Sequence, residues 1–257
     1  MQRIIAISGA ASGLGRALAQ RLAAVGDRVI GVDRSGVQVE ADLGAEAGRA
    51  EALRRIGELA EGRLDGLALA AAVGPHRPAQ EVTRVNYFGV LALLDGLLPM
   101  LEQGEAPAAL VVASVGAYFD ESCDAALVEA CLSGSEEAAL QSCDSLRLSG
   151  FMAYSSTKRA LIRAIKSRAA DWGARGVRLN ALAPGNMETP MLESLYAHPK
   201  IGPAARALSV PLGHNAKPEQ VAAVAAFLLG ADANYIHGAA LLADGGMMAA
   251  MRPDANA

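Results

Sequence analysis

A tyrosine and a lysine stand four positions apart in the stretch Tyr154-Ser155-Ser156-Thr157-Lys158. If the stretch is helical, both side chains lie on one face of the helix. A free tyrosine titrates at about 10 and is a poor acid or base at neutral pH, but a nearby cation favours the phenolate and lowers the pKa. The pair therefore predicts a proton carrier, Tyr154, whose pKa is lowered by Lys158, although the same spacing also fits a solvated helix face. Apolar residues at helical spacing support the helix: Leu161, Ile162, Ile165, Ala169 and Trp172.

A serine ends the apolar run 108–113 ahead of the tyrosine. The run is typical of a buried strand, so Ser114 lies at the carboxyl end of that strand, where parallel α/β sheets bind ligands. There the serine hydroxyl can donate a hydrogen bond to a substrate carbonyl oxygen while Tyr154 supplies the proton. These residues predict chemistry on an alcohol or a ketone.

The chain opens with a predicted strand, a glycine-rich turn and a helix. Residues 3–8 form a short β-rich run, and apolar residues at helical spacing follow from position 17. Glycines between them let the backbone approach a pyrophosphate, whose charge is met by the N–H groups and the positive dipole at the helix start. The spacing G-x-x-x-G-x-G predicts dinucleotide contacts at Gly9, Ser12, Gly13, Leu14 and Gly15.

An acidic residue, Asp33, ends the second predicted strand, 28–33. Its carboxylate can accept hydrogen bonds from the adenosine ribose hydroxyls and would repel a 2′-phosphate, which favours NAD over NADP. Arg34 argues for the opposite choice, because a guanidinium beside the ribose can accommodate that phosphate. A further short run, 37–41, begins after only three residues, so we predict that the usual crossover helix is reduced to a turn.

The rest of the chain alternates predicted helices and strands. No Pro/Gly/Ser-rich linker divides it, so we predict one domain over residues 1–257. The expected fold class is α/β, a doubly wound, mostly parallel Rossmann sheet of seven strands with helices on both faces. The further helices are predicted at 44–61, 85–98 and 219–229, and the further strands at 64–74, 176–183 and 239–243.

The glycine turn, Asp33, Ser114 and the Tyr154/Lys158 pair together resemble the short-chain dehydrogenase/reductase family, and the resemblance covers essentially the whole chain. It implies hydride transfer between NAD and a secondary alcohol or ketone, with a small apolar substrate. Within the family the chain is most similar to bacterial hydroxysteroid dehydrogenases that also reduce other carbonyl compounds, so steroids are among the candidate substrates. The features that carry this similarity are the shortened segment after Asp33, the phrase 85–89, the long insertion before Tyr154, the segment 173–184 and the tail 251–253.

The resemblance also implies roles for further residues. It implies that Asn86 bends its helix and holds a water that links Lys158 to solvent. Residues 71–74 lack the Asn side chains common in the family, so contacts at Ala71 and Gly74 are expected from backbone groups. The resemblance places Asp42 and Leu43 near the adenine, and places the nicotinamide and a phosphate beside Pro184, Gly185, Met187 and Thr189.

Two regions depart from a plain Rossmann pattern. Forty positions separate Ser114 from Tyr154, more than in most of the family, and the segment 120–149 has the pattern of one or two amphipathic helices. Their apolar stripe is expected to cover either the active site or, as the favoured alternative, a second subunit in a homodimer or homotetramer. Residues 189–214 are predicted to form a mobile lid over an apolar substrate, or else a plain surface covering.

Charge and composition argue against several partners. The net charge of −4 at pH 7 and the lack of a Lys/Arg cluster argue against nucleic acid and anionic membranes. We find no apolar run of the ~18 to 20 residues that a membrane span needs, and a strand from position 3 leaves no room for a signal peptide, so a cytoplasmic location is expected. Three cysteines without CxxC spacing and four histidines without ligand spacing predict no disulfide framework and no metal site.

Three alternatives to an NAD-dependent dehydrogenase of this kind stay open. The first is a general ketone or aldehyde reductase with no steroid role. The second is a dinucleotide-binding sensor or scaffold without catalysis, which the complete set of Asn86, Ser114, Tyr154 and Lys158 disfavours. The third is a 3-oxoacyl thioester reductase, which would use NADPH and basic residues for its carrier and is disfavoured by Asp33 and by the net charge.

Overall fold

Seven strands pair into a single sheet in the computed structural model, which describes residues 2–253. The strand order is β3-β2-β1-β4-β5-β6-β7, and every neighbouring pair is parallel. The order reverses between β1 and β4, the switch point where such sheets bind ligands. The predicted doubly wound sheet is confirmed, and it is wholly parallel. The strands are β1 (Ile4–Ser8), β2 (Arg28–Asp33), β3 (Val39–Glu40), β4 (Gly66–Leu69), β5 (Ala108–Val112), β6 (Arg178–Pro184) and β7 (Ala240–Ala243).

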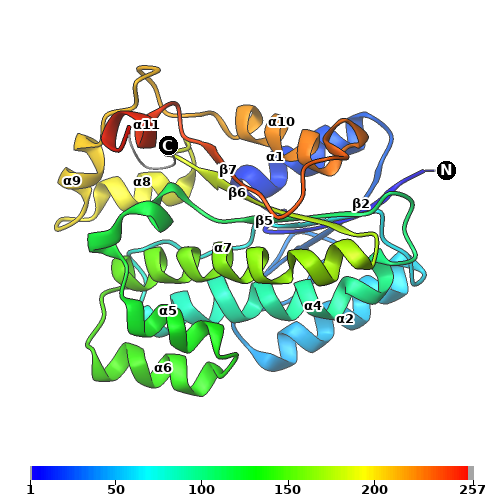
Figure 1. Cartoon of the computed structure of the whole chain (residues 1–257), viewed down its shortest axis with the longest axis horizontal. Coiled ribbons are helices and arrows are strands. Elements are labelled where there is room, and N and C mark those ends of the chain that lie inside the picture. Colours follow the sequence, from blue (N-terminus) through cyan, green and yellow to red (C-terminus); the bar gives the residue numbers. More distant parts are fainter. Residues whose placement is uncertain (1, 254–257) are drawn as a thin grey trace.

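Helices cover both faces of this sheet (Figure 1). One face carries α1 and α10, and the opposite face carries α2, α4 and α7. Each helix turns an apolar stripe toward the sheet, as Leu14, Leu18 and Leu22 of α1 show by their burial. Burying one leucine stabilises the fold by about 1.5–3 kcal/mol, so these stripes hold the strand ends in place. The helices are α1 (Gly13–Ala24), α2 (Glu46–Ala60), α4 (Val90–Leu101), α7 (Gly150–Ala174) and α10 (Pro218–Leu229).

The connection from β2 to β3 contains no helix. The Ala41 N–H donates to the Asp33 carbonyl at 2.8 Å, and the Gly31 N–H donates to the Gln38 side chain at 2.9 Å, so the chain closes as a short turn. The shortened crossover predicted after Asp33 is confirmed.

A long apolar helical run, Ala79–Leu101, lies in the core. It joins α3 (Ala79–Thr83), a π-helical turn η1 (Arg84–Gly89) and α4. By length and composition alone this run could cross a membrane, although Glu81, Arg84 and Asp95 interrupt its apolar residues. Its most apolar stretch is 56% buried inside the fold, because α4 packs between α2 and the sheet. A buried core helix has the same composition as a membrane span.

The insertion before Tyr154 folds as two short helices, α5 (Ala125–Leu132) and α6 (Glu136–Ser145). Each begins at a capping side chain, since Asp124 accepts the Leu127 N–H and Ser135 accepts the Ala138 N–H. Figure 1 shows the pair as an outer layer beside α7, where α5 packs on α7 and α6 packs on α3. The apolar residues buried there are Leu127, Val128, Cys131, Ala139 and Cys143.

These contacts bear on the interpretation of the insertion. Its apolar stripe was expected to cover either the active site or a second subunit. In the structure the buried part of the stripe packs on α7 and α3 of the same chain, whose outer flanks are themselves apolar. A role of the insertion as a cover for the active site or for a second subunit stays a prediction.

Candidate active site

A cleft of about 480 Å³ opens at the carboxyl ends of the strands. It brings together nearly all the residues that the sequence singled out, although they come from segments between position 9 and position 189. Two predicted residues, Gly74 and Asn86, do not line it. The predicted residues that do are Gly9, Ser12, Gly13, Leu14, Gly15, Asp33, Asp42, Leu43, Ala71, Ser114, Tyr154, Lys158, Pro184, Gly185, Met187 and Thr189.

The glycine turn forms one wall of the cleft at the start of α1. A Cβ on Gly15 would lie 2.1 Å from the Gly9 carbonyl oxygen, and a Cβ on Gly9 would lie 2.8 Å from the Ala71 nitrogen. Gly9 also has a φ of +75°, which favours glycine. Backbone packed this closely leaves the first turn of α1 open to the cleft, and its free N–H groups and positive dipole suit a diphosphate. These residues therefore fit a dinucleotide.

Carboxylates mark the end of the cleft nearest β2 and β3. One Asp33 oxygen accepts the Ala11 N–H at 3.1 Å, and the other accepts the Arg34 N–H at 2.7 Å. Asp42 is fixed in a similar way, since it accepts the Gly44 N–H at 2.9 Å. Each carboxylate oxygen has a lone pair left over, so Asp33 is held in place and can still accept ribose hydroxyls. The Arg34 side chain lines the same end.

The loop after β4 is held by hydrogen bonds to two buried side chains, Ser8 and Asn86. The Ala71 N–H donates to the Ser8 hydroxyl at 3.1 Å. Asn86 makes a paired contact with Val73, because its Oδ1 accepts the Val73 N–H at 2.8 Å and its Nδ2 donates to the Val73 carbonyl at 3.0 Å. Asn86 is fully buried within the π-helical turn η1. It acts on the cleft through the backbone of Val73, a contact that no local pattern indicated, and the anchoring role of Ser8 was also missed.

Tyr154 and Lys158 enter the cleft from the first turns of α7, and Ser114 enters from the end of β5. Lys158 is 1% exposed, and its Nζ donates to the Val112 carbonyl at 2.8 Å while lying 5.7 Å from the centre of the Tyr154 ring. The Ser114 Oγ accepts the Gly116 N–H at 3.1 Å. That contact uses an acceptor lone pair, so the serine proton stays available for a donor bond.

Burial controls the titration of this pair. It raises the pKa of the Tyr154 phenol, against a smaller lowering by a hydrogen bond with Ser114. Burial also lowers the pKa of the Lys158 ammonium to about 7. The spacing predicted that Lys158 lowers the pKa of Tyr154. In the protein without a bound cofactor, the pKa of Tyr154 is raised instead. The spacing placed the two groups correctly, but it carried no information about the cost of burying their charged forms.

We expect the substitution Lys158→Met to remove a pH dependence of stability. Above about pH 7 the unfolded chain keeps a proton on Lys158 that the folded chain has lost, so wild-type stability rises with pH up to the ordinary lysine pKa. From about pH 7 to about pH 9 the wild type should gain about 2 kcal/mol relative to the variant. Urea unfolding of the cofactor-free proteins at three pH values across this window measures the difference.

The matched control is Lys166→Met, on the exposed face of the same helix. This variant should follow the wild-type pH dependence. Parallel stability curves for the wild type and Lys158→Met would show that Lys158 stays charged in the folded chain.

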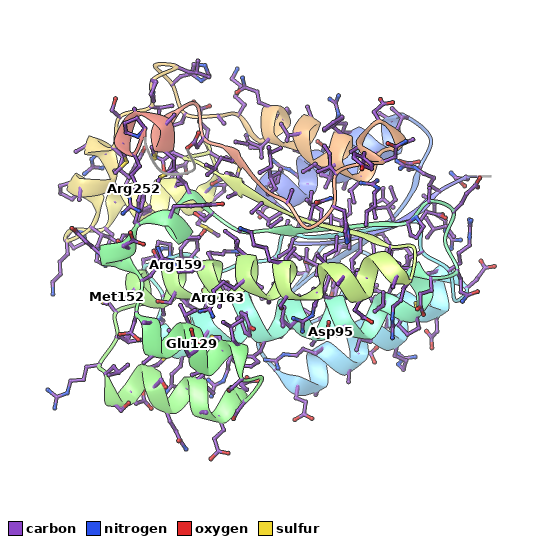
Figure 2. All side chains as sticks on the ribbon, viewed as in Figure 1. Asp95, Glu129, Met152, Arg159, Arg163 and Arg252 are labelled. Atoms are coloured by element: carbon purple, nitrogen blue, oxygen red, sulfur yellow. The ribbon has the colours of Figure 1, made fainter. Side chains whose placement is uncertain are left out.

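Charged side chains tie the loop after Ser114 to α7 and to the C-terminal segment (Figure 2). Arg159 donates to the Ala117 carbonyl at 2.7 Å and to Asp120 at 2.8 Å, and Arg252 pairs with the same carboxylate at 2.7 Å. Both arginines lower the pKa of Asp120. The residue after the catalytic-site lysine thus anchors the chain segment that follows Ser114.

A parallel sheet with a glycine turn and a helix N-terminus at its switch point is typical of dinucleotide-binding proteins. The phenol, ammonium and hydroxyl groups beside that turn narrow the class to oxidoreductases that move a proton together with a hydride. Among residues 2–253 there is no cluster of three or more His, Cys, Asp or Glu side chains that could hold a metal ion.

Comparison with known proteins agrees with this class. Residues 3–123 match the model of the short chain dehydrogenase family, and residues 137–248 match a model described as enoyl-(acyl carrier protein) reductase. The 3-alpha-hydroxysteroid dehydrogenase/carbonyl reductase of Comamonas testosteroni is 39% identical, over 97% of this chain and 98% of its own length. The chain belongs to the short-chain dehydrogenase/reductase family, and it is an alcohol/ketone oxidoreductase acting on CH–OH groups.

Solved structures place it further within the family. The 3-alpha-hydroxysteroid dehydrogenase of Pseudomonas sp. B-0831, complexed with NADH, superposes with a TM-score of 0.95 at 42% identity, over 98% of this chain and 99% of that one. Levodione reductase gives a TM-score of 0.75 at 26% identity, over 96% and 98% of the two chains. The chain is thus similar throughout its length to hydroxysteroid dehydrogenases, as predicted.

Proposed function

We propose that this chain is an NAD(H)-dependent dehydrogenase that interconverts a secondary alcohol and a ketone on small apolar substrates, with 3α-hydroxysteroids among them. The observation that carries the proposal is the meeting of Ser114, Tyr154 and Lys158 in one cleft whose other end carries Asp33. The names of the similar proteins from Comamonas testosteroni and Pseudomonas sp. B-0831 support the steroid part.

The proposed roles follow from the contacts of each side chain. Tyr154 takes the proton from the substrate hydroxyl in oxidation and returns it to the carbonyl oxygen in reduction. Ser114, fixed by the Gly116 N–H, donates a hydrogen bond to the same oxygen and orients it. Lys158, when protonated, favours the phenolate form of Tyr154. A bound nicotinamide supplies or accepts the hydride, which is chemistry that belongs to the cofactor.

We assign Asn86 a positioning role. Its paired hydrogen bonds fix Val73, which lines the cleft, and its position in η1 widens the helix beside the site. A water relay from Lys158 to solvent, as the family resemblance implies, stays a prediction.

NAD is the proposed cofactor because Asp33 occupies the ribose end of the cleft. Its carboxylate is held by the Ala11 and Arg34 N–H groups and would lie close to a 2′-phosphate, which it repels. The NADH in the similar Pseudomonas sp. B-0831 structure supports the same choice.

Residues 189–214 border the cleft, where Thr189, Pro190 and Met191 line it. This segment holds α8 (Pro190–Ala197) and α9 (Gly202–Ala207), and Met191 lines the cleft. Its two ends are paired, since Ala216 accepts the Glu188 N–H and donates to the Asn186 carbonyl, both at 2.9 Å. A segment with a fixed base and few buried residues suits a lid, and we propose that it closes over an apolar substrate.

A substrate panel tests the proposed function. The purified protein is given a rigid 3α-hydroxysteroid, its 3β epimer and small secondary alcohols, each with NAD and with NADP, and absorbance of the reduced nicotinamide is followed. We expect turnover of the 3α-hydroxysteroid with NAD and at least about 10-fold lower kcat/KM with NADP, equivalent to about 1.4 kcal/mol of repulsion at Asp33. Turnover of small alcohols alone would support the general carbonyl reductase, and no turnover of any substrate would contradict the proposal.

Cellular location and subunit assembly are the last two properties that we propose. A cytoplasmic location stays a prediction. A homodimer or homotetramer also stays a prediction.

A further inference from the structure

The first residue of α6 reaches across to a buried arginine of α2. One Glu136 oxygen accepts from Arg49 NH1 at 2.6 Å, and the other accepts from Arg49 NH2 at 3.1 Å, which is a two-point contact. The Arg49 residue is only 8% exposed, whereas the Glu136 side chain keeps 31% of its surface exposed. The two residues are 87 positions apart in the chain.

The remaining N–H groups of Arg49 face the backbone of the cleft. Its Nε donates to the Leu43 carbonyl at 2.8 Å, and NH2 also lies 3.4 Å from the carbonyls of Gly44 and Arg84. Leu43, Gly44 and Arg84 all line the cleft at the end that carries Asp33 and Asp42. Arg49 thus joins two separate segments of the cleft wall, the loop after β3 and the start of η1.

Charge and burial explain why this arginine needs a partner. A guanidinium cannot shed its proton at working pH, so a buried one must be paired or strongly hydrogen-bonded. Glu136 supplies the opposing charge, and it stands at the N-terminus of α6, where the helix dipole favours a carboxylate. Arg84 Nε lies 3.8 Å from the same carboxylate. Glu136 of the insertion therefore fixes the Arg49 guanidinium, and Arg49 in turn fixes the backbone of the cleft wall.

Resting on the proposed function, we propose that Glu136 is a positioning residue for the adenosine half of the cofactor, and that the insertion serves the cofactor site through its contact with Arg49. Loss of the Glu136 charge frees the Arg49 fork to turn toward solvent. The loop 41–45 then loses the bond that fixes the Leu43 carbonyl. The nicotinamide end of the cleft, built on β5 and α7, does not depend on this contact.

The test is the variant Glu136→Gln, which keeps the shape of the side chain and removes its charge. ADP-ribose is the probe, because it carries the adenosine and diphosphate without a nicotinamide, and calorimetry gives its dissociation constant. We expect ADP-ribose and NADH to bind about 5-fold more weakly or worse, as for a lost charge-assisted hydrogen bond. With saturating NAD and substrate, kcat should change by less than about 2-fold, because only cofactor binding is affected.

The matched control is Glu129→Gln. Glu129 of α5 pairs with Arg163 of α7, and both side chains are about half exposed or more, so this pair also joins the insertion to the rest of the chain (Figure 2). It lies away from the cleft, and we expect no change in ADP-ribose affinity. Arg49→Lys is a second variant, because it keeps the charge but loses the planar fork that reaches both Leu43 and Glu136. It should weaken ADP-ribose binding in the same way.

The outcomes separate this inference from the proposed function. If Glu136→Gln or Arg49→Lys is folded and binds ADP-ribose with wild-type affinity, the inference is overturned. It is also overturned if kcat falls as far as affinity does, which indicates general loss of structure. If Glu136→Gln does not fold, the ADP-ribose affinity of Arg49→Lys alone tests the inference. If wild-type protein binds neither NADH nor ADP-ribose, the proposed function itself has failed.

Discussion

Tyr154→Phe is expected to lower kcat by about 1000-fold while leaving NADH affinity within a few-fold of wild type. The variant removes the hydroxyl that carries the proton and keeps the ring, and general acid–base groups contribute about 10² to 10⁴ in rate. The phenol lines the cleft beside Ser114, so its loss removes the proton carrier at the reacting oxygen. The measurement combines turnover of the preferred alcohol with NADH binding by fluorescence.

The control for this variant is Tyr87→Phe. Tyr87 is 2% exposed in the core and does not line the cleft. The substitution therefore removes a tyrosine hydroxyl that takes no part in the reaction. Activity of Tyr87→Phe should stay close to wild type. Wild-type turnover by Tyr154→Phe would show that the proton takes another route, and the assigned role of the tyrosine would be wrong.

Gly15→Ala is expected to abolish useful dinucleotide binding. The added Cβ would stand 2.1 Å from the Gly9 carbonyl oxygen, which is backbone and cannot turn aside as a side chain can. The start of α1 must then move away from the turn, and a displacement of about 1 Å at a positioned site can cost about 100-fold. We expect NADH affinity to fall by about 100-fold or more, together with about 1–3 kcal/mol of stability from overpacking.

Gly57→Ala provides the comparison for this substitution. It adds the same methyl group within a helix, α2, where the nearest obstacle is the flexible end of Met100 at 2.9 Å. Its NADH affinity should equal that of wild type. Should Gly15→Ala bind NADH as tightly as Gly57→Ala does, the diphosphate does not lie at this turn.

Local patterns accounted for much of the fold and of the site. The strand 28–33 ends at Asp33 as predicted, and Ser114 follows β5 at the predicted edge of the sheet. Tyr154 and Lys158 enter one cleft because four residues make about one turn of a helix. Patterns of this kind depend only on backbone geometry and on the alternation of apolar and polar residues, and both can be read within a short window of sequence.

Other features depended on partners distant in the chain. Arg49 looks like an ordinary charged residue of α2, and its role appears only when Glu136, 87 positions later, lies against it. Asn86 acts on Val73 rather than on the cleft directly. The apolar stripe of the insertion pointed to a partner, but the identity of that partner, α7 and α3 of the same chain, was decided by packing.

By itself, the sequence determined the order of strands and helices, the glycine turn, the carboxylate at the end of β2 and the spacing of the proton-carrying pair, because these are properties of short segments. The tertiary structure alone decided which surfaces are covered and that the apolar run Ala79–Leu101 is a core helix. It also decided that burial raises the pKa of Tyr154 and lowers the pKa of Lys158, which favours the neutral form of each. The reason is that solvent exclusion and charge pairing arise only where distant segments of the folded chain meet, so short segments of sequence do not reveal them.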